Sequence, residues 1–335
     1  MDPVSEAALS CRGLVKHYGS GKKVVRAVDG LDLEVRRGEC FGLLGPNGAG
    51  KTTTIEVLEG LTEPTAGEVH VLGRAWKSDS GWLRQRIGVS LQETNLSERL
   101  TVEETLRLFV SFFDQGPSVN ELLARVSLEE KRGAWYLNLS GGQKQRLAVA
   151  CALAGDPDIL FLDEPTTGLD PQSRRQMWEM LREQKAARRT ILISTHYMQE
   201  AERLCDRVAV VDHGKVIALG TPAELIGRLG GGDVVEVEVD AALEMPSLQA
   251  LPSVTSVALQ TSGASGASGV SPTSGPAPAG DALSRYLLHV GEPHLAVPAL
   301  LACVTTAGRK LVHLSTRSAT LEDVFVALTG RHLRD

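Results

Sequence analysis

The sequence lacks an apolar run long enough to cross a membrane. Its longest run, from Leu147 to Ala154, is far shorter than the about 20 residues that a membrane-spanning helix requires. The opening segment MDPVSEAALS also lacks the basic residues and the apolar core of a secretion signal. We therefore expect a cytoplasmic protein that does not enter a membrane unaided.

Paired cysteine motifs and an excess of basic residues are missing as well. The absence of CxxC motifs and His/Cys clusters argues against a zinc site or a disulfide framework. Reduced packing residues are expected instead at Cys11, Cys40, Cys151, Cys205 and Cys303. The formal net charge of −6 and the pI near 5.8 argue against a nucleic-acid-binding surface. We therefore expect no direct nucleic-acid partner.

The chain is long enough for more than one domain. Its 335 residues are 42% hydrophobic, which is enough to fill ordinary cores. Over residues 8–225, short apolar runs alternate with helical patterns, and this predicts an α/β domain with a largely parallel sheet. The predicted strands are ALSCRGLVKHYG, AVDGLDLEVRRGE, CFGLLG, IGVSLQ, DILFLDE, TILIST and RVAVVDHGK.

Residues 94–140 interrupt this alternation with helical patterns. TVEETLRLFVSFF begins with a capping box formed by Thr101 and Glu104, and SVNELLARVSL begins with another, formed by Ser118 and Glu121. Such pairs satisfy free backbone N–H groups at a helix start. We expect an inserted helical subdomain.

A small α+β domain is predicted over residues 226–335. Its strand patterns are DVVEVEVD, SRYLLHV and KLVHLS, and its helical patterns are EPHLAVPALLACVTTAG and TLEDVFVALTG. Residues 262–280 are rich in Ser, Gly, Pro and Ala and carry no charge, so we expect a flexible insertion there.

The segment GPNGAGKT has the spacing of a phosphate-binding loop. It follows the apolar CFGLL and precedes the helical TTTIEVLEG, which is the context such a loop requires. Its glycines allow backbone N–H groups to surround a phosphate, Lys51 supplies positive charge, and Thr52 offers a hydroxyl to Mg²⁺. The nucleoside triphosphate is expected to contact Gly45, Pro46, Asn47, Gly48, Ala49, Gly50, Lys51, Thr52 and Thr53.

Two carboxylates follow an apolar strand in DILFLDEPTTGLDP. Because parallel strands end at one edge of a sheet, Asp163 and Glu164 are expected beside the phosphate loop. Asp163 would hold Mg²⁺ through water, and Glu164 would orient and deprotonate the attacking water. The alternative is an ordinary solvated acidic turn.

Three further side chains are candidates with structural alternatives. Gln92, expected at a strand end, could transmit the geometry of Mg²⁺ and water to the helical segment. His196 could contact the γ-phosphate, or it is an exposed histidine near a helix start. Tyr18 could stack on the base, although an isolated tyrosine is more often a packing residue.

The segment LSGGQKQRLAVAC predicts a second phosphate contact. Ser140 and Gln143 have the spacing of a capping box. Capping does not explain Gly141 and Gly142, because glycine in a helix costs roughly 1 kcal/mol against alanine. A bare helix start favours an anion, since its N–H groups and dipole both attract negative charge. Because the chain already has a phosphate loop, the residues alone leave open which phosphate or other anion this helix start binds.

Six motifs, in this order and spacing, resemble the nucleotide-binding subunit of an ATP-binding cassette (ABC) protein: GPNGAGKT, Gln92, LSGGQ, ILFLDE, GLD and STH. The resemblance covers residues 8 to about 220 and implies a P-loop cassette with a mixed sheet that uses ATP and Mg²⁺. It also implies a head-to-tail homodimer, in which residues 140–143 contact the ATP held by the partner copy.

The resemblance assigns a role to each matching residue. Tyr18 matches the base-stacking residue, Asp163 the Walker B aspartate and Glu164 the general base. Asp170 matches the D-loop aspartate and His196 the switch histidine. The catalytic residues expected are Lys51, Gln92, Glu164 and His196, and the metal-binding residues expected are Thr52, Gln92 and Asp163.

The C-terminal segment STRSATLEDVFVALTG resembles the end of the extension on ATP-binding subunits of drug and antibiotic exporters, the daunorubicin-resistance-like group. This resemblance implies an ATPase that drives a separate permease at the inner face of the cell membrane. The alternative is a soluble ABC ATPase that acts on nucleic acid or ribosomes. The acidic charge counts against that alternative, as does the lack of a visible second cassette, coiled coil or zinc module in the sequence.

Overall fold

The computed structural model describes residues 7–19, 23–92, 94–229, 232–260 and 283–329. The chain divides into two compact units, of which the first reaches Pro222 and the second begins at Ala223. The flexible insertion predicted at 262–280 lies outside the described residues. None of the helices among the described residues is long and apolar enough to cross a membrane.

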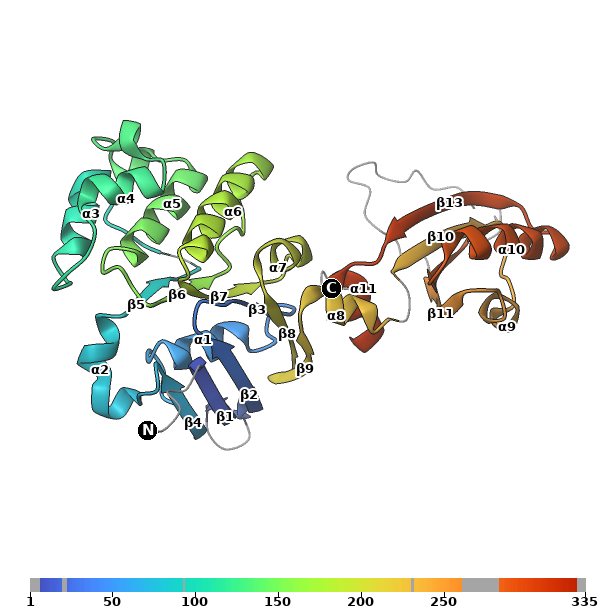
Figure 1. Cartoon of the computed structure of the whole chain (residues 1–335), viewed down its shortest axis with the longest axis horizontal. Coiled ribbons are helices and arrows are strands. Elements are labelled where there is room, and N and C mark those ends of the chain that lie inside the picture. The colour runs from blue at the N-terminus through green and yellow to red at the C-terminus, as the bar shows by residue number, and fades with distance from the viewer. Residues whose placement is uncertain (1–6, 20–22, 93, 230–231, 261–282, 330–335) are drawn as a thin grey trace. The chain divides into compact units, whose positions relative to one another are not determined.

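A six-stranded sheet forms the centre of the first unit, in the order β5-β6-β7-β3-β8-β9 (Figure 1). Its strands are β3 (Cys40–Leu44), β5 (Ile87–Ser90), β6 (Ile159–Asp163), β7 (Thr190–Thr195), β8 (Arg207–Asp212) and β9 (Lys215–Gly220). Every residue of β3, β6 and β7 is buried, as expected for parallel strands covered on both faces. The strand predicted through residue 215 is wrong. His213 and Gly214, with φ of 48° and 74°, form a tight turn into the antiparallel β9.

A second, antiparallel sheet has the order β2-β1-β4 and consists of β1 (Ala7–Tyr18), β2 (Val25–Arg36) and β4 (Ala66–Val71). Helix α1 (Lys51–Leu58) lies between the two sheets (Figure 1). Leu14 of β1, Phe41 of β3 and Ile55 of α1 belong to one buried apolar cluster. This core fixes the start of α1, where the predicted phosphate loop ends. The chain then continues through α2 (Trp76–Arg84) to β5.

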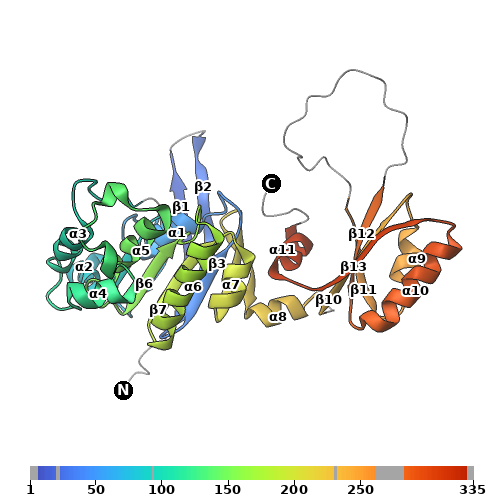
Figure 2. The ribbon, with the colours of Figure 1, turned by 90° about the horizontal axis from the view of Figure 1, so that it is seen from above.

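The predicted helical segment contains α3 (Val102–Val110) and α4 (Val119–Arg125), and it ends at Ser140, the N-cap residue of α5 (Gly141–Ala152) (Figure 2). Short 3-10 turns lie at Glu129–Lys131 and Tyr136–Asn138. The capping boxes predicted at Thr101 and Ser118 are both confirmed. Helices α6 (Pro171–Ala186) and α7 (Met198–Leu204) then follow β6 and β7.

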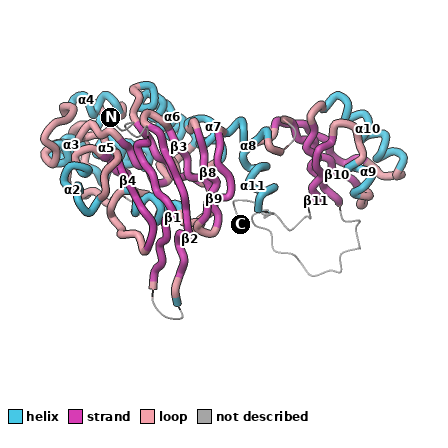
Figure 3. Tube along the Cα trace, turned by 60° about the horizontal axis from the view of Figure 1, so that its bottom comes forward, coloured by secondary structure: helices cyan, strands magenta, loops and turns pink. Residues whose placement is uncertain are grey.

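The second unit is an antiparallel sheet in the order β11-β12-β10-β13, with helices packed on it (Figure 3). Its strands are β10 (Asp233–Val239), β11 (Val254–Gln260), β12 (Ser284–Val290) and β13 (Leu311–Ser318). Its helices are α9 (Met245–Gln249), α10 (Pro293–Thr306) and α11 (Leu321–Thr329), and α8 (Pro222–Gly227) lies at the boundary between the units. Tyr286 of β12 and Leu300 of α10 lie in one buried cluster, so this unit has a core of its own.

Candidate nucleotide-binding site

The phosphate-binding loop, residues 45–50, joins β3 to α1. Gly50 has a φ of 101°, and a Cβ at this position would lie 2.3 Å from the carbonyl oxygen of Ala27. Only glycine combines this conformation with so close an approach. Asn47 and Gly48 are exposed and therefore accessible to a ligand.

Lys51, the first residue of α1, is buried between this loop and an acidic side chain. Its Nζ donates to the carbonyl oxygens of Gly45 at 2.7 Å and Pro46 at 3.0 Å. The same atom lies 3.6 Å from Glu164 Oε1. Burial lowers the pKa of Lys51, and the negative charge of Glu164 opposes this change. The loop, the cation and the predicted catalytic carboxylate are therefore adjacent.

Asp163 and Thr52 meet at the end of β6. The Thr52 hydroxyl donates to Asp163 Oδ1 at 3.4 Å, and Asp163 is buried. Ser194 of β7 is paired with Asp163 in the sheet and donates its hydroxyl to the same oxygen. Ser194 Oγ also accepts a hydrogen bond of 3.0 Å from the Glu164 backbone N–H. The sequence does not indicate that Ser194 holds Asp163 and Glu164 in place, because only the pairing of β6 with β7 brings these residues together.

Four side chains surround the Glu164 carboxylate. Its Oε1 lies 3.6 Å from Lys51 Nζ and 3.3 Å from His196 Nδ1. Its Oε2 accepts hydrogen bonds from Thr167 Oγ1 at 3.1 Å and from Gln92 Nε2 at 3.4 Å. Glu164 has a φ of 48°, a left-handed conformation that is uncommon for residues other than glycine. The structure thus places the predicted catalytic residues around a single carboxylate.

Gln92 and His196 contact Glu164 from the segments that follow two different strands, β5 and β7. His196 directly follows β7, and its ring lies beside that of Tyr197 with 4.1 Å between centroids. Gln92 lies beyond the end of β5 at Ser90, so the prediction that it ends the strand is wrong. The bend after β5 gives its amide the reach to Glu164.

Tyr18 ends β1 with a partly exposed ring. Its hydroxyl donates to Glu56 Oε2 at 3.3 Å, and Lys16 Nζ lies 4.9 Å from the ring centroid. The side chain is 40% exposed, which argues against the alternative of a packing residue.

At the start of α5, helix capping explains the presence of Ser140 and Gln143 in the LSGGQ segment. Ser140 Oγ accepts from the Gln143 backbone N–H at 3.3 Å, and Gln143 Oε1 accepts from the Ser140 backbone N–H at 3.0 Å. A Cβ at Gly142 would lie 2.5 Å from Ser173 Oγ, so the packing of this chain requires that glycine. A Cβ at Gly141 would meet nothing within 4 Å. Gly141 alone is left without an explanation from the packing of this chain.

Asp170 is the N-cap residue of α6. Its Oδ1 accepts hydrogen bonds from the backbone N–H groups of Gln172 at 2.9 Å and Ser173 at 3.0 Å. Hydrogen bonds from Ser173 lower the pKa of Asp170. Within one copy of the chain, this D-loop residue therefore stabilises the start of a helix.

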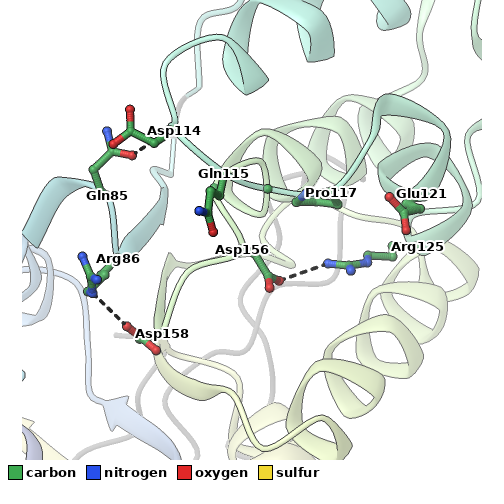
Figure 4. A pocket seen from close by; sticks show the side chains of 11 residues that line it. Gln85, Arg86, Asp114, Gln115, Pro117, Glu121, Arg125, Asp156 and Asp158 are labelled. Atoms are coloured by element: carbon green, nitrogen blue, oxygen red, sulfur yellow. Dashed lines mark hydrogen bonds and ion pairs between the residues drawn. The ribbon is translucent and has the colours of Figure 1, made fainter.

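A cleft of about 700 Å³ is lined by none of the predicted site residues (Figure 4). Arg86 Nε lies 3.7 Å from Asp158 Oδ2, which links the residues that precede β5 and β6. Arg125 Nη1 of α4 lies 3.5 Å from Asp156 Oδ1. The Arg125–Asp156 pair therefore connects the helical segment to the residues that lead into β6, and neither pair includes a residue of the phosphate loop.

The fold and the site define a P-loop nucleoside triphosphatase, because a glycine-rich loop, a lysine and strand-end carboxylates converge. The family model described as ABC transporter matches residues 28–167. The Nod factor export ATP-binding protein I of Ralstonia nicotianae is 41% identical over 336 residues, covering 99% of this chain and 96% of the relative. The chain therefore belongs to the ABC transporter family, as an ATP-hydrolysing subunit of a transport system.

Other known proteins support this assignment. The Nod factor export ATP-binding protein I of Cupriavidus metallidurans is 43% identical, covering 98% of this chain and 99% of the relative. The dimeric structure of MJ0796, a bacterial ABC transporter cassette, is 27% identical with a TM-score of 0.59, covering 64% of this chain and 98% of that one. The structure of CbiO1 from Clostridium perfringens, part of the ABC transporter complex CbiONQ, is 30% identical with a TM-score of 0.59. The match covers 67% of this chain and 92% of CbiO1. The predicted ABC cassette fold is confirmed.

Proposed function

We propose that this chain powers export through a separate membrane permease, and that it works at the cytoplasmic face of the cell membrane. The observation that carries the proposal is the likeness of nearly the whole chain to proteins named for Nod factor export. The resemblance of the C-terminal TLEDVF segment to drug and antibiotic exporters favours the same direction of transport. Nod factors and drugs of the daunorubicin type are therefore the two substrate classes that we propose.

Transport by inside-out membrane vesicles tests the direction. In vesicles that contain this chain and its permease, ATP added outside should drive accumulation of labelled Nod factor or of daunorubicin. Vesicles with the permease alone are the control. Accumulation of neither compound would contradict both proposed substrate classes, and ATP-dependent release of preloaded compound would contradict export.

We propose that ATP hydrolysis takes place around Glu164. The Thr52 hydroxyl and the Asp163 carboxylate are hard oxygen donors that meet at 3.4 Å, a donor set that suits Mg²⁺. Bound there, Mg²⁺ would neutralise charge on the phosphate oxygens. Lys51 would bind the phosphates from the loop. Glu164 would take the proton of the attacking water. Gln92 and His196, which contact the two different oxygens of the Glu164 carboxylate, would orient that carboxylate.

We propose a head-to-tail homodimer in which residues 140–143 contact the ATP bound to the partner copy. Gly141 supports this arrangement, because it is exposed at the start of a 12-residue helix and a Cβ added there would meet none of the described residues within 4 Å. Asp170, which caps the helix packed against Gly142, would approach the same interface. The dimeric structure of the MJ0796 cassette supports pairing of this kind.

We propose that the permease contacts the helical segment. Large apolar side chains are exposed there: Leu108 (44%), Phe112 (59%), Trp135 (53%) and Leu137 (55%). Several large apolar side chains exposed on one segment favour a protein partner. The Phe112 carbonyl accepts a hydrogen bond from Gln85, which lines the cleft of Figure 4, so the contact surface would border that cleft.

Phe112→Asp should weaken copurification of this chain with a tagged permease by about tenfold, or about 1.4 kcal/mol, because a charge replaces an apolar contact. Leu259→Asp is the matched control, since Leu259 is 49% exposed but lies in β11 of the second unit. Both variants should keep their melting temperature. Equal losses in the two variants, or a loss confined to Leu259→Asp, would contradict this permease surface.

A further inference from the structure

Glu200 is a buried carboxylate that the site described above does not include. It lies in the first turn of α7 and has 0% exposure. Carboxylates are almost never fully buried unless they are paired or hydrogen-bonded. Burial raises the pKa of Glu200, and hydrogen bonds from neighbouring side chains oppose this change. Its position therefore depends on those neighbours.

The two hydrogen bonds to the Glu200 carboxylate come from two separate segments. Glu200 Oε1 accepts from Thr166 Oγ1 at 2.9 Å and from Trp178 Nε1 of α6 at 3.1 Å. The Glu200 backbone N–H donates to the Tyr197 carbonyl oxygen at 3.1 Å. Glu200 thus links the segment after β6 and α6 to the segment that follows β7.

Two of these bonding partners are close in sequence to catalytic side chains. Thr166 lies two residues after Glu164, and Tyr197 immediately follows His196. Glu164 and His196 approach each other to 3.3 Å, and each lies just beyond the end of its strand. The Glu164 backbone N–H is still bonded to the Ser194 carbonyl oxygen of β7 at 3.1 Å, whereas Thr166 lies in the segment beyond that bond. A shift of about 1 Å in such a pair can lower turnover by about 100-fold.

We propose that Glu200 is a positioning residue for ATP hydrolysis. By tying Thr166 to the start of α7, which follows His196, its carboxylate fixes the separation of Glu164 and His196. The carboxylate accepts its hydrogen bonds from Thr166 and Trp178, neither of which belongs to the phosphate loop. The inference rests on the roles proposed above for Glu164 and His196.

Two substitutions of Glu200 distinguish the effect of losing its acceptor oxygen from the effect of losing its negative charge. Glu200→Leu removes the acceptor and should lower kcat by about 30- to 100-fold, with KM for ATP changed by less than about threefold. Glu200→Gln keeps one acceptor oxygen, and Glu200 Oε2 has no hydrogen-bond partner among the residues that the structure describes. Glu200→Gln should therefore keep kcat within about threefold of wild type. A comparable loss in both variants would overturn the proposal.

A second pair of variants separates positioning from folding. Thr166→Val and Trp178→Phe each remove one hydrogen bond to Glu200 Oε1, but only Thr166 lies beside Glu164. Thr166→Val should lower kcat by about tenfold at unchanged KM, whereas Trp178→Phe should lower the melting temperature and leave kcat nearly unchanged. These results are informative even if Glu200→Leu does not fold. Equal effects on kcat would mean that Glu200 stabilises the fold only.

Glu164→Gln distinguishes failure of this inference from failure of the proposed mechanism. It should abolish hydrolysis while ATP binding persists. If Glu164→Gln is inactive and Thr166→Val has wild-type kcat, the positioning role is overturned and the proposed mechanism stands. If Glu164→Gln hydrolyses ATP normally, the role of Glu164 is overturned, and the positioning role falls with it.

Discussion

Lys51→Ala should abolish ATP hydrolysis, lowering turnover by at least about 100-fold, which is the range observed when a positioned charge is removed from an active site. Lys51 Nζ lies 3.6 Å from Glu164 and within 3.0 Å of two carbonyl oxygens of the phosphate loop. It is the buried cation between the loop and the proposed base, so alanine removes the charge that would stabilise the phosphates. Hydrolysis should be measured at saturating ATP and Mg²⁺, with and without the permease.

Lys215→Ala is the control for loss of a lysine. Lys215 Nζ also forms an ion pair, at 3.5 Å from Asp29, but its side chain is 60% exposed. Exposed pairs of this kind contribute roughly 0–1 kcal/mol to stability, so this variant should fold and hydrolyse ATP normally. If Lys51→Ala is folded and its turnover remains near wild type, the role of the loop lysine in hydrolysis is disproved.

The sequence predicts the catalytic cassette well because its motifs are local. The glycine spacing of the phosphate loop requires the strand–loop–helix context, and β3 and α1 provide it. Capping boxes need only four consecutive residues, so Thr101, Ser118 and Ser140 were predictable as helix starts.

The contacts that position the catalytic residues were not predictable in the same way. Ser194 bonds Asp163 across 31 residues of sequence, and Glu200 bonds Thr166 across 34. Only the pairing of β6 with β7 and the packing of α7 bring these groups together. Gly142 is a similar case, because the close approach of Ser173 from α6 explains a glycine that the sequence associates with phosphate.

Some secondary structure was missed for physical reasons. β4 contains AGEVHV, in which only Val71 is buried, so it lacks the apolar run of a central strand. Helix α2 is interrupted at Asp79, where φ is −125°, and its segment WKSDSGWLR has weak helical character. In both, tertiary packing outweighs local sequence preference.

A mixed dimer of two inactive variants should recover ATP hydrolysis if LSGGQ acts across the interface. One variant is Lys51→Ala, which lacks a working phosphate loop. The other is Ser140→Arg, which places a bulky cation at the exposed start of α5. Each homodimer carries a fault at both sites. In the mixed dimer, one site combines the intact loop of one copy with the intact signature of the other, and the second site carries both faults.

Random pairing of equal amounts makes half of the dimers mixed, with one of two sites intact, so activity should recover to roughly a quarter of wild type. Ser118→Arg is the matched control for Ser140→Arg, because Ser118 is also an exposed N-cap serine in a capping box of the helical segment. It loses a cap worth about 1 kcal/mol and gains the same cation, yet should remain active as a homodimer.

A signature that acts on the nucleotide of its own chain predicts no recovery, since every chain in the mixture carries one fault. Strict cooperation between the two sites would also suppress turnover, so ATP-dependent formation of mixed dimers should be measured in parallel with differently tagged chains. The expected recovery agrees with the surroundings of Gly141. A Cβ added at Gly141 would meet none of the described residues of its own copy within 4 Å, so a partner's nucleotide has room there. If folded variants show neither mixed dimers nor recovered hydrolysis, LSGGQ does not complete the site of a partner copy.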